Sequence, residues 1–506
     1  MMKVERRKCL SLSSPAPTGG RQILAVDVGT THLKAGVLGA DGRLQRLAIR
    51  KLPVVRDETG RAEHDPETLW TRLVDAVREV VVEDPAGVRW MVLSAYQLGL
   101  LPVDESGAPL TGILTLQDTR SLETFPGLLE RTDFRTVYQH TGCPPLFQYP
   151  LAKIEWLRTR RPEIFRSARW LLDAKAYLLL RLFGRPVTDF STATASQLMD
   201  VRTLRWAPDL LALAGITEEQ LPEAVAPETV LGPLRPEAAE ALGLSLETEV
   251  IAGVYDGGAV GLGLGAIAPG VGVMNLGTTA MVRRAADHPV LDSSPRMRLQ
   301  TYYLAGGLWF PGGAINNAGS TLQWLQELLG LDIPQQEARI DAKEPTDLLF
   351  LPFLTGERFP EISPWARGVL FGLRAHHGPG HLLRAAMEGV AFALRLVLEA
   401  LAENGLMPRR LRAGGGGARS DLWMRILASV FGMPVEVPEI PEPALVGGAV
   451  LARVASGAAP DLPSAQMDMP VRVYEPVADW VPRYREQFHA FQALLADLAT
   501  AFARSL

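Results

Sequence analysis

The 506-residue chain has only two cysteines, Cys9 and Cys143. Their number and spacing exclude a disulfide framework and a cysteine-based zinc site, which predicts a cytoplasmic protein. No apolar run reaches the roughly 18 residues that cross a bilayer, so no membrane partner is expected. The first twenty residues carry basic side chains but no apolar segment of a secretion signal. We therefore expect residues 1–20 to be a disordered N-terminal tail or a misplaced start.

Several nucleotide-binding and nucleic-acid-binding signatures are also missing. The formal net charge is −5, which argues against a nucleic-acid partner because phosphate backbones are bound mainly by basic surfaces. The G-x-x-x-x-G-K-[ST] pattern of a P-loop does not occur. The glycine run that starts at Gly414 has Arg419 where a dinucleotide fingerprint needs its last glycine. These absences exclude a P-loop and disfavour a dinucleotide fold.

The hydrophobic pattern predicts two lobes of mixed α/β structure. Hydrophobic residues make up 47% of the chain, enough for large cores, and the length favours two or three domains. Residues 23–51 read as a β-meander and residues 89–96 as a strand, with helical spacing between them. A second strand–turn–strand unit follows a glycine-rich boundary near residues 265–272. The predicted architecture is two lobes with a cleft between them.

Two Gly-Thr-Thr turns carry the strongest chemical signal. Gly29-Thr30-Thr31 and Gly277-Thr278-Thr279 each join two predicted strands. Backbone N–H groups in glycine turns form anion-binding concavities. A single triplet is better explained as an ordinary β-turn, but the matched pair predicts two cradles for one polyphosphate. Asp27 stands two residues before the first turn, where a carboxylate suits Mg²⁺ beside phosphates; Asn275 takes that place in the second.

Asp256 follows a predicted strand and begins a glycine-rich helix. One interpretation is a helix N-cap, a common role for aspartate. The other is a general base that accepts the proton of an acceptor hydroxyl during phosphoryl transfer. The two roles are compatible, and the local sequence does not decide between them.

Taken together, these motifs resemble the FGGY family of carbohydrate kinases in the actin-like ATPase superfamily. LAVDVGTTHLKAGVL resembles the family's first phosphate motif, MNLGTTAMV the second, and LRAGGGGARSDLWMRILASVFGMPV its adenosine loop and helix. The resemblance implies two actin-like (ribonuclease H-like) lobes with mixed sheets flanked by helices, ATP and Mg²⁺ as cofactors, and a sugar or polyol as acceptor. It implies an N-terminal lobe over 21–266, a C-terminal lobe over 267–465, and a helical extension, 466–506, docked on the second lobe.

The resemblance also assigns residues to roles. Asp256 matches the catalytic base and Asp27 the metal-side carboxylate. The residues that it places at the nucleotide are Gly29, Thr30, Thr31, Lys34, Gly277, Thr278, Thr279, Gly319, Gln323, Gly416 and Gly417. Gln97, Asp118 and Arg120, with Asp256, match positions that bind the acceptor.

Within the family, the likeness is greatest to gluconokinase-like members. YDGGAVGLGLGAI, GGAINNAGSTLQWL and LPFLTGERFPEISPWARGVLFGL carry that likeness. Arg358 or Arg367 is a candidate for binding a sugar acid's carboxylate, although either arginine equally suits an ion pair with Glu357 or Glu361. Gln97-Leu98 replaces the usual Met-His, and Leu116 the usual Trp. A xylulokinase or other polyol kinase, or a nucleotide-binding sensor without sugar transfer, therefore stays open, as does homodimer formation.

Two further groups of residues are assigned structural roles. Trp156, Trp324 and Trp423 lie at apolar positions of predicted helices, which favours packing over base stacking. The histidines, including His376 and His377, show no metal-ligand spacing and are expected to be solvated or structural.

Overall fold

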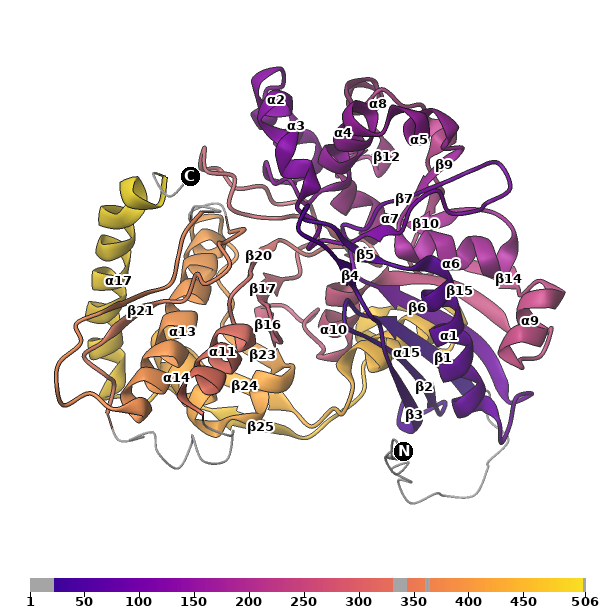
Figure 1. The fold of residues 1–506 in the computed structure, drawn as a ribbon. Coiled ribbons are helices and arrows are strands. Elements are labelled where there is room, and N and C mark those ends of the chain that lie inside the picture. The colour runs from indigo at the N-terminus through magenta and orange to yellow at the C-terminus, as the bar shows by residue number, and fades with distance from the viewer. Residues whose placement is uncertain (1–21, 331–343, 360–361, 363–364, 504–506) are drawn as a thin grey trace, which may run out of the picture.

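The computed structural model describes residues 22–330, 344–359, 362 and 365–503. The predicted N-terminal tail, residues 1–20, lies outside this range. The described chain forms two lobes, each built on a six-stranded mixed sheet with helices against it (Figure 1). This arrangement confirms the predicted two-lobed α/β fold.

The first sheet contains the predicted meander and the strand that leads to Asp256. Its order is β14-β15-β6-β1-β2-β3. Neighbours β1, β2 and β3 are antiparallel, whereas β6 lies parallel to β1 and β15 parallel to β6. The strands are β14 (Val230–Pro233), β15 (Glu249–Tyr255), β6 (Val88–Ala95), β1 (Gln22–Val28), β2 (His32–Leu38) and β3 (Leu44–Lys51).

The second sheet repeats this topology. Its order is β20-β17-β16-β23-β24-β25, with β16 and β17 antiparallel and β23 parallel to β16. The strands are β20 (Gly312–Ile315), β17 (Ala280–Arg284), β16 (Val271–Leu276), β23 (Arg410–Gly414), β24 (Val435–Pro438) and β25 (Val471–Tyr474). Strands β16 and β17 thus occupy the places that β1 and β2 occupy in the first lobe.

Helices cover the sheets, and common capping residues mark where the helices begin and end. Asp65 caps α1 (Pro66–Val81) by accepting the Thr68 N–H at 2.7 Å, and Gly184 ends α6 (Ala174–Phe183) at φ +78°. In the second lobe, α17 (Trp480–Ala503) lies beside α13 and α14 (Figure 1). The other large helices are α11 (Gly319–Leu329), α13 (Pro379–Glu403), α14 (Asp421–Phe431) and α15 (Pro443–Ala455).

A layer of smaller elements stands over the end of the first sheet at which β1 and β15 finish (Figure 1). It includes α4, which carries Lys153 and Trp156, and α7, whose Ser191 contacts the end of β15. Its elements include β5 (Ala62–His64), β8 (Ile113–Leu114), α2 (Phe125–Glu130), α3 (Phe134–Thr141), α4 (Pro150–Arg160), α5 (Pro162–Ser167), α7 (Phe190–Ala193) and α8 (Pro208–Ala214).

The two lobes meet through a close helix pair. Helix α10 (Asp256–Gly263) belongs to the first lobe in sequence, whereas α15 comes from the second. A Cβ on Gly263 would lie 1.8 Å from the Pro443 carbonyl oxygen, and one on Gly447 would lie 1.9 Å from that of Ala259. Only glycine permits this backbone contact. Because α10 begins at Asp256, the helix pair fixes the predicted base at the junction of the lobes.

None of the helices described by the structure has the length and apolar character needed to cross a membrane.

Candidate active site

Asp27 lies near the end of β1, between Lys34 of β2 and Ser94 of β6 in the sheet register. The Ser94 hydroxyl donates to Asp27 Oδ1 at 2.7 Å. Burial raises the pKa of Asp27, while the Ser94 hydrogen bond and the Lys34 charge oppose the rise. Sequence patterns alone did not identify Ser94, because its role depends on strand register.

The Lys34 ammonium is already engaged. It forms an ion pair with Glu442, the residue before α15, at 2.6 Å between Nζ and Oε2. This pair ties β2 to the helix that joins the lobes. The structure thus places Lys34 beside Asp27, and a direct contact between Lys34 and a phosphate stays a prediction.

The first Gly-Thr-Thr turn continues from β1. The Gly29 N–H donates to the His32 carbonyl at 2.9 Å, which closes the turn. His64 Nε2 lies 3.0 Å from the Thr30 carbonyl, and His64 Nδ1 lies 2.8 Å from the Tyr96 hydroxyl. Thr31 is exposed. The buried His64 therefore supports the turn at the Thr30 carbonyl, while the Thr31 side of the turn is exposed to solvent.

The second turn is braced by backbone groups instead. The Gly319 N–H, at the start of α11, donates to the Gly277 carbonyl at 3.0 Å. The Gly277 N–H donates to the Thr279 carbonyl at 3.0 Å. A Cβ on Gly319 would lie 2.5 Å from the Gly277 oxygen, so glycine is required for this contact. Thr278 is exposed beside the helix N-terminus.

The glycine loop packs against the end of the same strand. Gly415 has φ +87°, and a Cβ there would lie 2.5 Å from the Leu276 carbonyl oxygen. A Cβ on Gly417 would lie 2.7 Å from the Trp423 ring, whereas open space surrounds Gly416. The second turn, the start of α11 and this loop therefore lie together at the end of β16, and their role as a nucleotide site stays a prediction. Gln323, on α11, is exposed, and its amide donates to Glu327 at 2.9 Å.

Asp256 is the first residue of α10, and Tyr255 takes the N-cap position. The Asp256 carboxylate accepts the N–H of Gly257 at 2.7 Å. Its role is therefore not that of the N-cap residue itself, which was one of the two interpretations of the sequence.

The pKa of Asp256 is raised to about 7. Burial is the main cause, and the negative charge of Asp27 adds to it; the Gly257 N–H, Arg358 and Arg283 act in the opposite direction. Because the charge of Asp27 contributes to this shift, the predicted metal-side carboxylate lies near the predicted base. A carboxyl group with a pKa near neutrality is well matched to accept a proton at physiological pH.

The second lobe also reaches Asp256. A Cβ on Gly257 would lie 3.2 Å from the Met281 sulfur on β17, the strand that leaves the second turn. Asp256 is thus bordered by Asp27 from the first lobe and by β17 from the second. Asp27 precedes the first turn and Met281 follows the second, so residues next to both turns border the start of α10.

Of the two candidate arginines, only Arg358 influences this carboxylate. Arg358 as a residue is half-buried, and its Nε is buried without a hydrogen-bond partner among the described residues. The Glu357 carboxylate accepts the backbone N–H groups of Asn316 and Arg358; no ion pair joins it to the Arg358 guanidinium in the described part of the chain. Glu361 lies outside the described residues. Arg367 instead donates to the carbonyls of Trp365 and Ala366.

Gln97 is connected through Ser191 to Tyr255, the residue that precedes Asp256. Its amide donates to the Ser191 carbonyl at 3.2 Å, and the Ser191 hydroxyl accepts the Tyr255 N–H at 3.0 Å. The next residue, Leu98, has φ +65°, a left-handed backbone that costs a residue with a Cβ about 1–2 kcal/mol. The altered acceptor segment is therefore a strained turn that is held near the end of β15 by Ser191.

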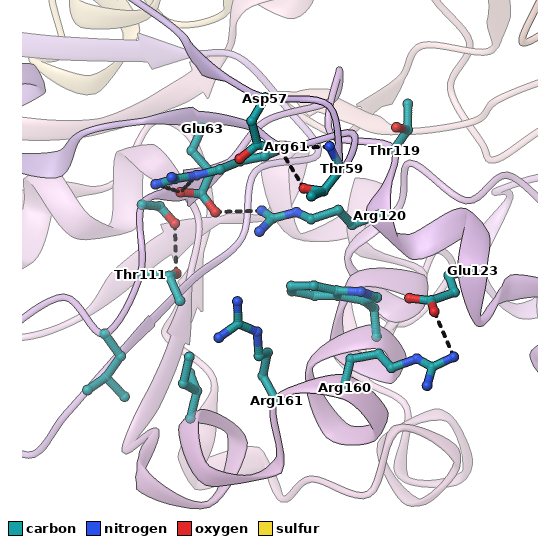
Figure 2. Close-up of a pocket in the computed structure, with 14 residues that line it drawn as sticks. Asp57, Thr59, Arg61, Glu63, Thr111, Thr119, Arg120, Glu123, Arg160 and Arg161 are labelled. Carbon is teal, nitrogen blue, oxygen red and sulfur yellow. Dashed lines mark hydrogen bonds and ion pairs between the residues drawn. The ribbon is translucent and has the colours of Figure 1, made fainter.

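Asp118 and Arg120 bind each other. The buried Asp118 carboxylate accepts the Arg120 guanidinium, with 2.6 Å between Oδ2 and Nη2, and the Ala62 N–H. Arg120 also pairs with Glu63 and lies over the Trp156 ring in a cavity of about 780 Å³ (Figure 2). Neither Asp27 nor Asp256 lines that cavity. The structure thus shows a supporting ion-pair network here, and direct binding of the sugar by these two residues stays a prediction.

Comparison with known proteins agrees with this arrangement. Residues 22–263 match the N-terminal domain, and residues 272–456 the C-terminal domain, of the FGGY family of carbohydrate kinases. A gluconokinase from Bacillus subtilis (strain 168) is 31% identical over 92% of this chain and 93% of its own length. A xylulose kinase from Escherichia coli (strain K12) is 28% identical over 95% of this chain and 100% of its own length.

Solved structures share the fold. The gluconate kinase from Lactobacillus acidophilus superposes with a TM-score of 0.91, at 26% identity, over 96% of this chain and 99% of its own. The two-lobed fold is thus that of known sugar kinases. The chain belongs to the FGGY family of carbohydrate kinases, and it is an ATP-dependent sugar kinase.

Proposed function

We propose that this sugar kinase phosphorylates a hydroxyl of gluconate or a closely related sugar acid. The position of Arg358 carries the proposal. Its positive charge lowers the pKa of Asp256, so the guanidinium lies near the proposed base. A buried Nε without a partner is costly unless a ligand supplies an acceptor. A carboxylate on the acceptor supplies that acceptor and binds a guanidinium with paired hydrogen bonds.

The acceptor hydroxyl lies against Asp256 in the proposed mechanism. Its oxygen forms a bond to the γ-phosphorus of ATP while the bond from that phosphorus to the β–γ bridging oxygen breaks, and ADP leaves. The hydroxyl proton passes to the Asp256 carboxylate and then to solvent. Since such transition states are loose, orientation of the hydroxyl and late acceptance of its proton are sufficient roles for Asp256.

The two turns hold the phosphates of ATP. Gly29, Thr30 and Thr31 offer backbone and hydroxyl donors from one side, and Gly277, Thr278 and Thr279 offer them from the other. The surface formed by Gly319, Gln323, Gly416 and Gly417 receives the nucleoside, because open space surrounds Gly416.

A Mg²⁺ site fits at Asp27. The Ser94 hydroxyl donates to Oδ1 of Asp27, and in the part of the chain that the structure describes no hydrogen-bond donor binds Oδ2. That oxygen is available as a direct or water-mediated ligand, which suits a cation that keeps several waters and phosphate oxygens. When bound there, Mg²⁺ neutralises charge on the phosphates and reduces the repulsion between Asp27 and Asp256.

Release of ADP in the presence of different acceptors tests this function. We expect gluconate to give the highest kcat/KM among gluconate, xylulose, glycerol and glucose. In Arg358→Gln, the KM for gluconate should rise about tenfold or more, the cost of leaving one charge unpaired, while the KM for ATP stays unchanged. Arg367→Gln is the matched control, since Arg367 contacts only carbonyls of its own turn among the described residues.

A ketopentose such as xylulose is the second candidate. The neutral Gln97 amide near the base favours it, as does the similarity to xylulose kinases. If the enzyme prefers xylulose and Arg358→Gln is fully active on xylulose, the proposed substrate becomes the ketopentose instead of gluconate. Failure of every sugar to stimulate ADP release would contradict both.

A further inference from the structure

Lys153 of α4 is completely buried, and its ammonium binds only backbone oxygens. It donates to the carbonyls of Leu98, Leu114 (3.3 Å) and Thr115 (2.7 Å). No ion pair joins it to a carboxylate within the described residues. A buried cation with three neutral acceptors is costly to maintain, so its position calls for a role beyond packing.

The three carbonyls belong to the two segments that flank the predicted acceptor site. Leu98 is the residue with the left-handed backbone next to Gln97. Thr115 leads into Leu116, the position where the family resemblance expects a tryptophan. Lys153 therefore joins the strained turn of one segment to the end of the other, β8.

We propose that Lys153 is a positioning residue for the sugar, and that its ammonium fixes the Leu98 turn and the end of β8 in the geometry that admits the acceptor. The proposal rests on the proposed placement of the acceptor beside Gln97 and Asp256, and it applies to whichever sugar the enzyme phosphorylates. Lys153 touches neither ATP nor the reacting hydroxyl in this role.

The charge of Lys153 varies near neutral pH. Burial lowers its pKa to about 7; the charge of Asp118 opposes this shift, and that of Arg120 adds to it. A neutral amine has two N–H donors for three carbonyls. Above pH 7 the Leu98 turn should therefore loosen, and the KM for the sugar should rise. The rise is separate from the Asp256 titration, which acts on kcat and in the opposite direction.

The variant Lys153→Met tests the proposal, because methionine is unbranched and apolar and keeps most of the packing volume. We expect the KM for the sugar to rise about tenfold, since buried carbonyls lose their donor, with the KM for ATP unchanged. The pH dependence of the sugar KM should disappear, while the rise of kcat with pH remains. Lys51→Met, at an exposed lysine of β3, is the control.

Rescue by Leu98→Gly separates positioning from general stability. Glycine adopts φ +65° without strain, so Lys153→Met/Leu98→Gly should recover most of the sugar KM. If Lys153→Met does not fold, the wild-type enzyme and Leu98→Gly decide the matter. The wild-type sugar KM should rise between pH 6.5 and 8.5, with a midpoint set by the Lys153 pKa of about 7. Leu98→Gly should flatten that rise.

Several results would overturn the proposal. The first is a wild-type sugar KM that does not change across this pH range. The second is an equal rise of the KM values for sugar and ATP in Lys153→Met. The third is a folded double variant in which Leu98→Gly does not restore the sugar KM. If gluconate is not a substrate but another sugar is, the proposal for Lys153 is unaffected, because the same measurements are then made with that sugar.

Discussion

The two Gly-Thr-Thr turns occupy equivalent places in two sheets of the same topology, yet the residues around them differ. Asp27 faces Lys34 and Ser94 in the first sheet, whereas Asn275 faces Met281 and Gly414 in the second. The first turn is braced by ionisable side chains. The second is braced by the backbone of α11 and the glycine loop.

This difference divides the chemistry between the lobes. The charged groups beside the first turn suit a cation and a proton acceptor, since the negative charge of Asp27 raises the pKa of Asp256. The uncharged, glycine-rich surface beside the second turn allows a nucleotide to approach the backbone closely. Two sheets of the same topology thus have different roles: the first lobe carries the proposed reacting groups, and the second lobe carries the proposed nucleotide surface.

Removal of the base should have the largest effect. In Asp256→Asn, kcat should fall by about 10²–10⁴-fold, the usual contribution of a general base, while ATP still binds. Calorimetric titration with ATP and the ADP-release assay check the two halves of this statement. Near-normal turnover by a variant that binds ATP would remove Asp256 from the mechanism.

The pH dependence has a defined sign. The wild-type kcat should increase with pH through about 7, since Asp256 must lose its proton to act as a base. Its folded pKa lies above the ordinary value of 3.8, so the native state loses stability as pH rises from about 4 to about 7. At pH 8, the free energy of unfolding of Asp256→Asn should exceed that of the wild type by a margin on the order of 4 kcal/mol, which thermal unfolding measures. Below pH 4 the margin should vanish.

The next prediction exchanges the residues that differ beside the two turns. Asp27→Asn gives the first turn the residue of the second, and the Mg²⁺ concentration for half-maximal rate should rise about 10- to 100-fold. Loss of the Asp27 charge should also move the acid limb of kcat to lower pH, because that charge raises the pKa of Asp256. Asn275→Asp is the matched variant, and it should raise the KM for ATP without changing the Mg²⁺ requirement. Unchanged Mg²⁺ dependence in Asp27→Asn would place the cation elsewhere.

The sequence was most informative where chemistry follows from local pattern. The β-meander of residues 23–51, the turn glycines and the start of α10 at Asp256 all depend on neighbouring residues, and the structure contains each of them. The buried side chains of Trp156 and Trp423 confirm the packing prediction. For Trp324 that prediction is wrong: its residue is 43% exposed, because helical spacing identifies an apolar face without showing what covers it.

Partners distant in sequence were beyond local reasoning. Glu442 binds Lys34 across 408 positions, and the buried Lys153 takes carbonyls from two other segments. His376 and His377 showed no ligand spacing, yet the fold brings both beside Asp347, where His377 Nε2 lies 2.7 Å from Oδ1. His377 Nδ1 accepts the Arg374 N–H at 3.0 Å, which leaves Nε2 to donate to Asp347. His377 therefore has a structural hydrogen-bonding role, and a structural or solvated role for His376 stays a prediction.

The smallest expected effect distinguishes packing from binding within the second lobe. Gly415→Ala places a Cβ against the Leu276 carbonyl at φ +87°, so the protein should lose about 1–3 kcal/mol of stability and bind ATP less tightly. Gly416→Ala projects into open space, so stability should stay within about 0.5 kcal/mol while the KM for ATP rises several-fold. Thermal unfolding and ATP titration of both variants, with Gly127→Ala as an open surface control, separate the two effects. Equal ATP affinity in Gly416→Ala and wild type would mean that the nucleotide does not use this loop, because a methyl group at an occupied surface has to displace its ligand.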